Sequence, residues 1–142
     1  MTLIGIVTSS CQSQPIRDVV CFQEKCVQVE IAQKPGELTR GLQFREQLAF
    51  DAGMLFIFPH SHKHSFWMKD TKIPLDMIWM DSSRRVVDVK KNVPPCIKDP
   101  CAVYTPQSEA RYVLEINSGA ADVFKIHSGD TASFRFNSEK QF

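Results

Sequence analysis

At 142 residues, the chain is long enough for one well-buried domain and too short for two independent cores. Hydrophobic residues make up 43% of the sequence and include 10 Phe, which excludes a disordered body. The 17 Lys and Arg nearly balance the 16 Asp and Glu, so the net charge is +1. Such a charge provides no field to attract nucleic acid phosphates or lipid headgroups, and we expect no nucleic acid partner.

The N-terminal segment has the features of a truncated export signal. Residues 1–10 are uncharged and apolar or small, and Cys11 follows them. They are too few for a transmembrane helix, which needs about 20 apolar residues. Small residues before a cysteine resemble the cleavage site of bacterial lipoproteins, although the usual basic segment is missing. We predict that residues 1–18 are a disordered signal remnant or tether with a lipidated Cys11; an incidental cysteine in a disordered tail is the alternative.

The other four cysteines form two pairs with the same spacing, Cys21 with Cys26 and Cys96 with Cys101. The first pair brackets a short polar segment between apolar runs, so a tight hairpin would place the two cysteines opposite each other. The second pair brackets a segment of a proline-rich loop, which a bridge would clamp. We predict two disulfides. A four-thiolate zinc site is the alternative, but both turns lack the glycine that zinc knuckles usually contain. Disulfides indicate export from the cytoplasm.

Strand patterns dominate the rest of the chain. Apolar and polar residues alternate over 27–31, and continuous apolar runs at 53–58 and 75–80 are too short for confident helices. Further strands are predicted at 84–93, 112–117 and 131–137, giving about eight in all. This pattern predicts a mainly β domain over 19–137, a compact antiparallel β-sandwich or jelly-roll-like barrel, with a tail at 138–142. Two short helices are predicted at 35–40 and 120–125.

Four motifs stand in a characteristic order along the chain. They are Arg-Gly-Leu-x-Phe-Arg from residue 40, Gly-Met-Leu-Phe-x-Phe from 53, Phe-Trp-Met-Lys-x-Thr-x-Ile-Pro-Leu-Asp-Met from 66, and Tyr-Val-Leu-Glu-x-Asn-x-Gly from 112. Over residues 19–136 the sequence strongly resembles the prokaryotic family known as domain of unknown function 192. The resemblance implies a jelly-roll-like β-sandwich that is often exported or lipid-anchored, and it implies no settled activity.

Polar residues gather within these motifs. Trp67 and Lys69 are two apart on a predicted strand and should share one face, while Phe66 and Met68 point into the core. Asp76 begins the next strand and could pair with Lys69 across the intervening turn.

Two arginines complete the predicted cluster. Arg40 and Arg45 lie on an irregular segment that could fold over the same sheet end. Convergence of these groups would form a basic, aromatic-walled pocket suited to a carboxylate, a phosphate or a sugar. An ion-pair network that merely closes the sandwich is the structural alternative. The predicted ligand-binding residues are Arg40, Arg45, Trp67, Lys69, Thr71 and Asp76.

Three histidines, His60, His62 and His64, alternate along the chain, and an extended backbone would project them to one side. Three imidazoles can bind zinc, copper or nickel. No acidic or cysteine partner is adjacent, so we treat them as weak candidates and expect no metal.

Recognisable catalytic signatures are missing from the sequence, and we expect no cofactor. The best enzymatic hypothesis is a small envelope hydrolase that uses Asp76 with Lys69 or Glu115. Glu115 is more readily explained as a solvent-facing residue or as a partner of Arg111, four positions away on the same strand face.

The sequence favours a monomeric, non-catalytic binding module in the cell envelope. Its partner would be a small anionic or glycan ligand or an envelope protein, and its contact with the membrane would be a lipid on Cys11. We expect it in the periplasm or on the outer cell surface. The hydrolase is one alternative, and an accessory structural domain without a ligand is the other.

Overall fold

The computed structural model describes residues 17–137, so Cys11, most of the predicted tether and the predicted tail lie outside the described residues. Asp18, the last residue of the predicted tether, is buried. Its carboxylate accepts the backbone N–H of Asn137 at 2.7 Å, and its carbonyl accepts that of Val29 at 2.8 Å. The predicted boundary after residue 18 therefore lies inside the packed body.

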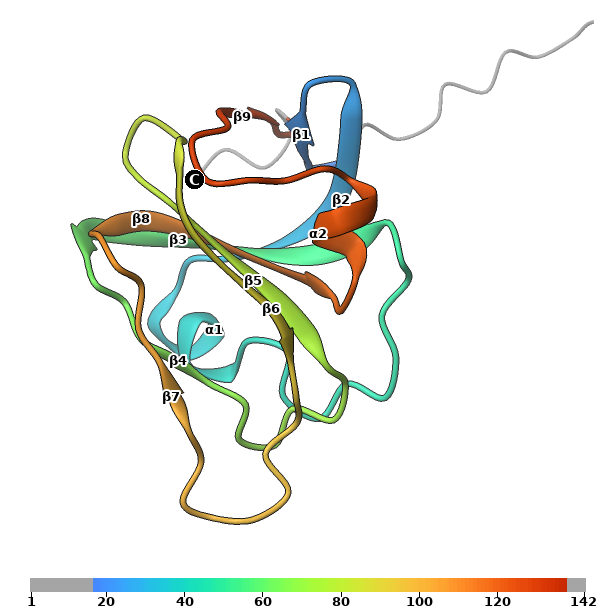
Figure 1. Cartoon of the computed structure of the whole chain (residues 1–142), viewed down its shortest axis with the longest axis vertical. Coiled ribbons are helices and arrows are strands. Elements are labelled where there is room, and N and C mark those ends of the chain that lie inside the picture. Colours follow the sequence, from blue (N-terminus) through green and yellow to red (C-terminus); the bar gives the residue numbers. More distant parts are fainter. Residues whose placement is uncertain (1–16, 138–142) are drawn as a thin grey trace, which may run out of the picture.

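The described chain is mainly β with two short helices, as predicted (Figure 1). The elements in chain order are β1 (Val19–Phe22), β2 (Lys25–Ala32), α1 (Pro35–Arg40), β3 (Ala52–His62), β4 (Phe66–Trp67), β5 (Leu75–Met80), β6 (Val86–Val93), β7 (Val103–Tyr104), β8 (Ala110–Asn117), α2 (Ala120–Val123) and β9 (Ala132–Arg135). Strands β4 and β7 are only two residues long, and the sequence pattern indicates them least clearly.

Seven strands form one sheet in the order β6-β5-β8-β3-β2-β1-β9, and β4 pairs with β7 in a separate small sheet. Neighbouring strands are antiparallel except β2 and β3, which run parallel and differ from the predicted pattern. The connection between them, residues 33–51, contains α1 and is long enough to return the chain to the same end of the sheet.

The large sheet curls into a half-barrel (Figure 1). Its two edge strands approach each other where the chain enters β6 and β9, because Arg85 and Thr131 form a β-bridge. Two backbone hydrogen bonds extend this contact, from Val86 to Asp130 at 2.8 Å and from Ala132 to Arg84 at 2.9 Å. The contact shields part of each edge from further strand pairing.

Side chains pack against both faces of the sheet, as the continuous apolar runs predict. One core contains Leu55, Ile78 and Leu114 together with residues of α2. The other core contains Phe56 and Trp79 and is covered by α1 and the β4–β7 pair. All six residues of β5 are buried, so β5 contributes to both cores.

Both predicted disulfides are confirmed in the structure. Cys21 and Cys26 are directly opposite in the β1–β2 hairpin, with 2.04 Å between their sulfurs. Cys96 and Cys101 close the loop between β6 and β7, with a sulfur–sulfur distance of 2.14 Å. Within residues 17–137, the helices are too short and insufficiently apolar to cross a membrane.

Close packing of β3 against β8 predicts the effect of a single methyl group. A Cβ at Gly53 would lie 2.4 Å from the carbonyl oxygen of Glu115 and 2.8 Å from the side chain of Ile116. We expect Gly53→Ala to lower the free energy of unfolding by about 1–3 kcal/mol in urea titrations. Gly36→Ala is the control, because a Cβ there meets nothing within 4 Å. Equal urea midpoints for the two variants would contradict this packing.

Candidate functional site

A pocket of about 230 Å³ opens on the side of the sheet that α1 and β4 cover. Its walls come from α1 and the loop that follows it, from β3, from β4 and the residues before it, and from β8. These segments are far apart in sequence, so the pocket exists only in the folded domain. It is the candidate functional site.

Local backbone chemistry places α1 at the edge of the pocket. Pro35 occupies the first turn, and the backbone N–H groups of Gln33 and Lys34 donate to the Glu37 carboxylate at 3.1 and 3.0 Å. These hydrogen bonds lower the pKa of Glu37. The helix ends at Gly41, whose φ of +49° favours glycine.

Gly41 also allows the chain to pass close to the floor of the pocket. A Cβ at this position would lie 3.0 Å from the ring of Phe56 and 4.0 Å from a carboxyl oxygen of Glu115. Further along the loop, the N–H of Phe44 donates to the carbonyl of Asp70 at 2.8 Å. The loop after α1 is thereby joined to the turn after β4, and the two enclose the pocket together.

Aromatic rings line much of the pocket. Phe66 meets Phe56 edge to face at 4.9 Å between centroids, and His64 stacks on Phe58 at 3.7 Å. Behind them, the indole N–H of Trp79 donates to the carbonyl of His64 at 2.9 Å. Because each ring contacts another, we expect the wall to keep its shape when the pocket is empty.

Glu115 contributes a buried carboxyl group to this pocket. Its residue surface is only 4% exposed, yet no hydrogen bond or ion pair joins its side chain to another residue within 17–137. Its neighbours across the strands are Met54 on β3 and Met77 on β5, which offer no charge. Burial raises the pKa of Glu115 to about 8, so the carboxyl group is mostly neutral at pH 7.

Three of the six predicted ligand-binding residues, Arg40, Trp67 and Thr71, line the pocket. The alternation predicted around Trp67 is present, because Met68 is buried and Trp67 is 48% exposed. Arg40 is exposed on α1, and Thr71 is buried. Residues that carry an indole, a guanidinium and a hydroxyl group therefore line one cavity.

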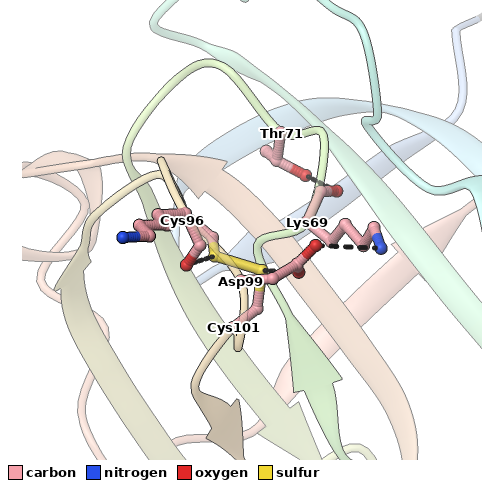
Figure 2. Close-up of a disulfide and its surroundings, with 6 residues drawn as sticks. Lys69, Thr71, Cys96, Asp99 and Cys101 are labelled. Atoms are coloured by element: carbon pink, nitrogen blue, oxygen red, sulfur yellow. Dashed lines mark hydrogen bonds and ion pairs between the residues drawn. A yellow bond between two sulfur atoms is a disulfide. The ribbon is translucent and has the colours of Figure 1, made fainter.

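The other two predicted cations lie outside the pocket lining. Arg45 forms a two-pronged ion pair with Glu30 at 2.7 and 2.9 Å, which lowers the pKa of Glu30 and raises that of Arg45. Lys69 contacts Asp99 of the disulfide loop at 3.6 Å (Figure 2) and lies 5.5 Å from the centre of the Trp67 ring. The predicted convergence of three cations is therefore wrong.

Asp76 is fully buried and has a structural environment. One carboxylate oxygen accepts the N–H of Asn92 at 2.8 Å, and the other accepts those of Gly119 and Ala121 at 3.0 and 2.9 Å. The predicted Lys69–Asp76 ion pair is wrong, because Lys69 pairs with Asp99 instead. Asp76 binds the end of β6 and the start of α2 to β5.

The carboxylate pair of the hydrolase hypothesis is not formed. In the β5–β8 register Asp76 is opposite Ile116, whereas Glu115 is opposite Met77. Side chains of successive residues alternate across a sheet, so the two carboxyl groups lie on opposite faces. The expected Glu115–Arg111 pair is also wrong, since Arg111 donates to the carbonyl of Phe58 at 3.3 Å.

Sequence reasoning misplaced Glu115 on the surface. The sequence does contain an indication that Glu115 is buried, because this acid lies inside the apolar run 112–116 of a predicted strand. Such a position is buried on either face, so an acid there must be neutral or paired.

The three histidines do not gather around one point. His64 Nε2 lies 2.9 Å from the carbonyl oxygen of His60, and its ring centre is 5.6 Å from that of His62. Across residues 17–137, no group of three His, Cys, Asp or Glu side chains is arranged to hold a metal ion.

The sequence matches one protein family over most of its length. The model of the family DUF192, described as Uncharacterized ACR, COG1430, matches residues 19–134. The chain belongs to this family. The UPF0127 protein of Thermococcus gammatolerans is 30% identical over 118 residues, which cover 80% of this chain and 70% of that protein.

Two solved structures share the DUF192 fold. One, described as a candidate transcription regulator from Sinorhizobium meliloti 1021, has a TM-score of 0.75 and 30% identity over 83% of this chain and 92% of its own. The other, a protein of unknown function from Novosphingobium aromaticivorans, has a TM-score of 0.74 and 29% identity over 90% and 91% of the two chains. The family is described as uncharacterised, and the second structure as a protein of unknown function.

The buried state of Glu115 predicts a specific dependence of stability on pH. The pKa of Glu115 in the folded protein is about 8, whereas the ordinary pKa of an exposed glutamate is 4.5. Between these two values the folded state binds the extra proton, so the contribution of Glu115 to stability falls as pH rises. Glu115→Gln removes the charge and keeps the shape.

We expect Glu115→Gln to gain stability relative to wild type as pH rises from 5 to 9, on the order of a few kcal/mol. Urea titrations of both proteins across this range measure the difference, in which the other titrating groups cancel. Parallel stability curves would show that the carboxyl group is ionised and solvated in the folded protein.

Proposed function

We propose that this DUF192 domain is a non-catalytic binding module that receives a small ligand, or one side chain of a partner protein, in the pocket beside α1. The observation that carries the proposal is the buried, unpartnered carboxyl group of Glu115 in the pocket. Within residues 17–137 no fully buried side-chain oxygen lacks a hydrogen-bond partner, so the Glu115 oxygens are accessible from the pocket that this residue lines. A carboxyl group in so confined a place is poorly solvated, and a hydrogen-bonding partner there would stabilise it. A ligand would supply that partner.

The size of the pocket supports a small occupant. Its volume of about 230 Å³ lies below the roughly 300–1,000 Å³ of pockets that bury drug-sized molecules. A sugar ring, a small metabolite or a single extended side chain matches this scale. The aromatic wall favours an occupant with an apolar face. The hydroxyls of Thr71 and Ser65 already bond to the Lys69 carbonyl and to Thr105, and each keeps the capacity to accept a further hydrogen bond.

Non-catalytic binding is favoured over hydrolysis because the groups required for hydrolysis are separated. The carboxylate of Asp76 is occupied by three backbone donors, and it is on the other face of the sheet from Glu115. A glycosidase needs two carboxyl groups facing one another across its substrate.

An anionic or glycan ligand is the interpretation that the sequence motifs favour. Arg40 on the exposed rim would bind the anion, and the exposed indole of Trp67 would stack on a sugar. Arg45 and Lys69 are already paired with acids, so Arg40 would be the main cationic anchor for such a ligand.

We also propose that the protein is exported and held at the membrane through a lipid on Cys11, in the periplasm or on the outer cell surface. The two disulfides support this proposal, since disulfides persist in oxidising compartments. The uncharged segment before Cys11 gives independent support from the sequence. An envelope location would give the pocket access to peptides, glycans and small metabolites outside the cytoplasm.

Trp67 provides a test of the binding function. A thermal-shift screen of sugars, amino acids, amines and carboxylates should find a compound that raises the melting temperature of the wild-type protein. We expect Trp67→Ala to weaken binding of that compound about three- to tenfold, because one wall of the pocket is lost.

Val103→Ala is the matched control for this screen. Val103 pairs with Trp67 across the β4–β7 sheet and is 62% exposed, but it does not line the pocket. The Val103→Ala variant should bind the compound found in the screen as tightly as the wild type does. Equal affinities for wild type and Trp67→Ala, or a screen without any binder, would count against the proposed site.

Cys11 provides a test of the proposed anchoring. In the source organism, the wild-type protein should fractionate with membranes, and mass spectrometry should find a lipid on Cys11. Cys11→Ser should move the protein to the soluble fraction, because a covalent lipid is the proposed link to the bilayer. Ser13→Ala is the control and should stay with the membrane. An unlipidated Cys11 in the wild-type protein would refute the anchor.

A further inference from the structure

We propose that the group recognised at the floor of the pocket is a primary ammonium on an alkyl chain, as carried by a small amine or by a lysine side chain of a peptide. This inference rests on the proposed binding function and specifies its ligand chemistry. It departs from the anionic ligand that the motifs suggested. Three features of the pocket lead to it: the partnerless acid, the aromatic wall, and the positions of the other charges.

The first feature is the partnerless acid on the floor. The Glu115 carboxyl group is more than nine-tenths buried, and one of its oxygens lies near the chain at Gly41, beside the pocket. An ammonium group offers three donors and a full positive charge, so it satisfies an ionised carboxylate better than any neutral ligand. A ligand carboxylate would face a second acid at short range, where one of the two must stay protonated.

The aromatic wall is the second feature. Phe56, Phe58, Phe66 and Trp67 line the pocket together with Glu115. The faces of aromatic rings attract cations, by about 0.5–2 kcal/mol depending on how far the pair is desolvated. The same rings offer apolar surface to the methylene groups of an alkyl chain. A cation that carries such a chain therefore matches both the wall and the floor.

The third feature is the position of the other charges. The titratable or charged side chains that line the pocket with Glu115 are Arg40 and His64. Arg40 is exposed on α1, so solvent and salt screen its repulsion of an incoming cation. His64 uses one ring nitrogen on the carbonyl of His60.

On the two neighbouring strands, the residues paired with Glu115 carry no charge. The residues opposite it are Met54 on β3 and Met77 on β5. The low-dielectric floor is therefore acidic while the solvated rim is basic. Because charges interact more strongly in the interior than in solvent, the floor determines selectivity.

Calorimetry of the full chain with n-butylammonium, butyramide and butyrate tests this inference. The three probes have similar shape and differ in charge. We expect butylammonium to bind at least tenfold more tightly than the other two at pH 8. Its binding should release close to one proton when the starting pH is well below 8, because Glu115 must ionise to pair with it.

The dependence on pH gives a second readout on the wild-type protein. Butylammonium affinity should rise about tenfold per pH unit between pH 6 and 7 and level off above pH 8. Butyrate that binds more tightly than butylammonium, or butylammonium binding that is independent of pH, would overturn the inference. If butyrate bound and Trp67→Ala abolished its binding, the ammonium inference would be overturned and the proposed binding function would stand.

Glu115→Gln and Val103→Ala are the matched variants, because Val103 is exposed and does not line the pocket. Glu115→Gln should lower the affinity for butylammonium at least tenfold and should abolish proton release, whereas Val103→Ala should keep both. Circular dichroism checks that each variant is folded. Unchanged butylammonium affinity in Glu115→Gln would refute the assignment.

Comparison of butylammonium with Nα-acetyl-lysine N-methylamide distinguishes the two sources of the ammonium group. Tighter binding of the lysine derivative indicates a peptide side chain as the natural occupant, and tighter binding of butylammonium indicates a free amine. Both results support recognition of an ammonium group. Failure of both probes, with another compound still bound in a Trp67-dependent manner, would overturn the ammonium assignment and leave the proposed function standing.

Discussion

The alternation of side chains along β8 is the constraint on which the site depends. β8 lies between β3 and β5 in the sheet, so each of its residues is committed to one of two packed faces. Leu114 and Ile116 enter the core beneath α2, and Glu115 is therefore directed to the face beneath α1. A register shift of one residue would bury Glu115 among aliphatic residues and remove the carboxyl group from the pocket.

The same alternation separates two acids that the sequence makes look equivalent. Asp76 faces the α2 side, where three backbone N–H groups satisfy its carboxylate and hold neighbouring segments together. Glu115 faces the α1 side, where no group within residues 17–137 hydrogen-bonds to its side chain and its carboxyl oxygens are open to the pocket. Asp76 thus stabilises the fold, and Glu115 is available to a ligand. The aromatic wall and the glycine-ended helix α1 keep the space above Glu115 open.

Much of the fold could be predicted from local patterns. The apolar runs of β3 and β5, the bridged hairpin Cys21–Cys26 and the two short helices all follow from residue spacing. The parallel β2–β3 pair could not be predicted, because its direction depends on how the 33–51 connection packs. The pocket residues Trp67 and Arg40 were predicted, but the pairings of Arg45 with Glu30 and Lys69 with Asp99 depend on distant segments that local sequence does not reveal.

The central claim is that the folded domain holds a buried, protonated carboxyl group at the floor of a ligand pocket. Carbon-detected NMR of protein labelled at the glutamate side-chain carboxyl carbons can follow each carboxyl group through a pH titration, with Glu115→Gln identifying the resonance. The Glu115 signal should titrate near pH 8. A midpoint near 4.5, the ordinary pKa of an exposed glutamate, would contradict the buried, protonated state.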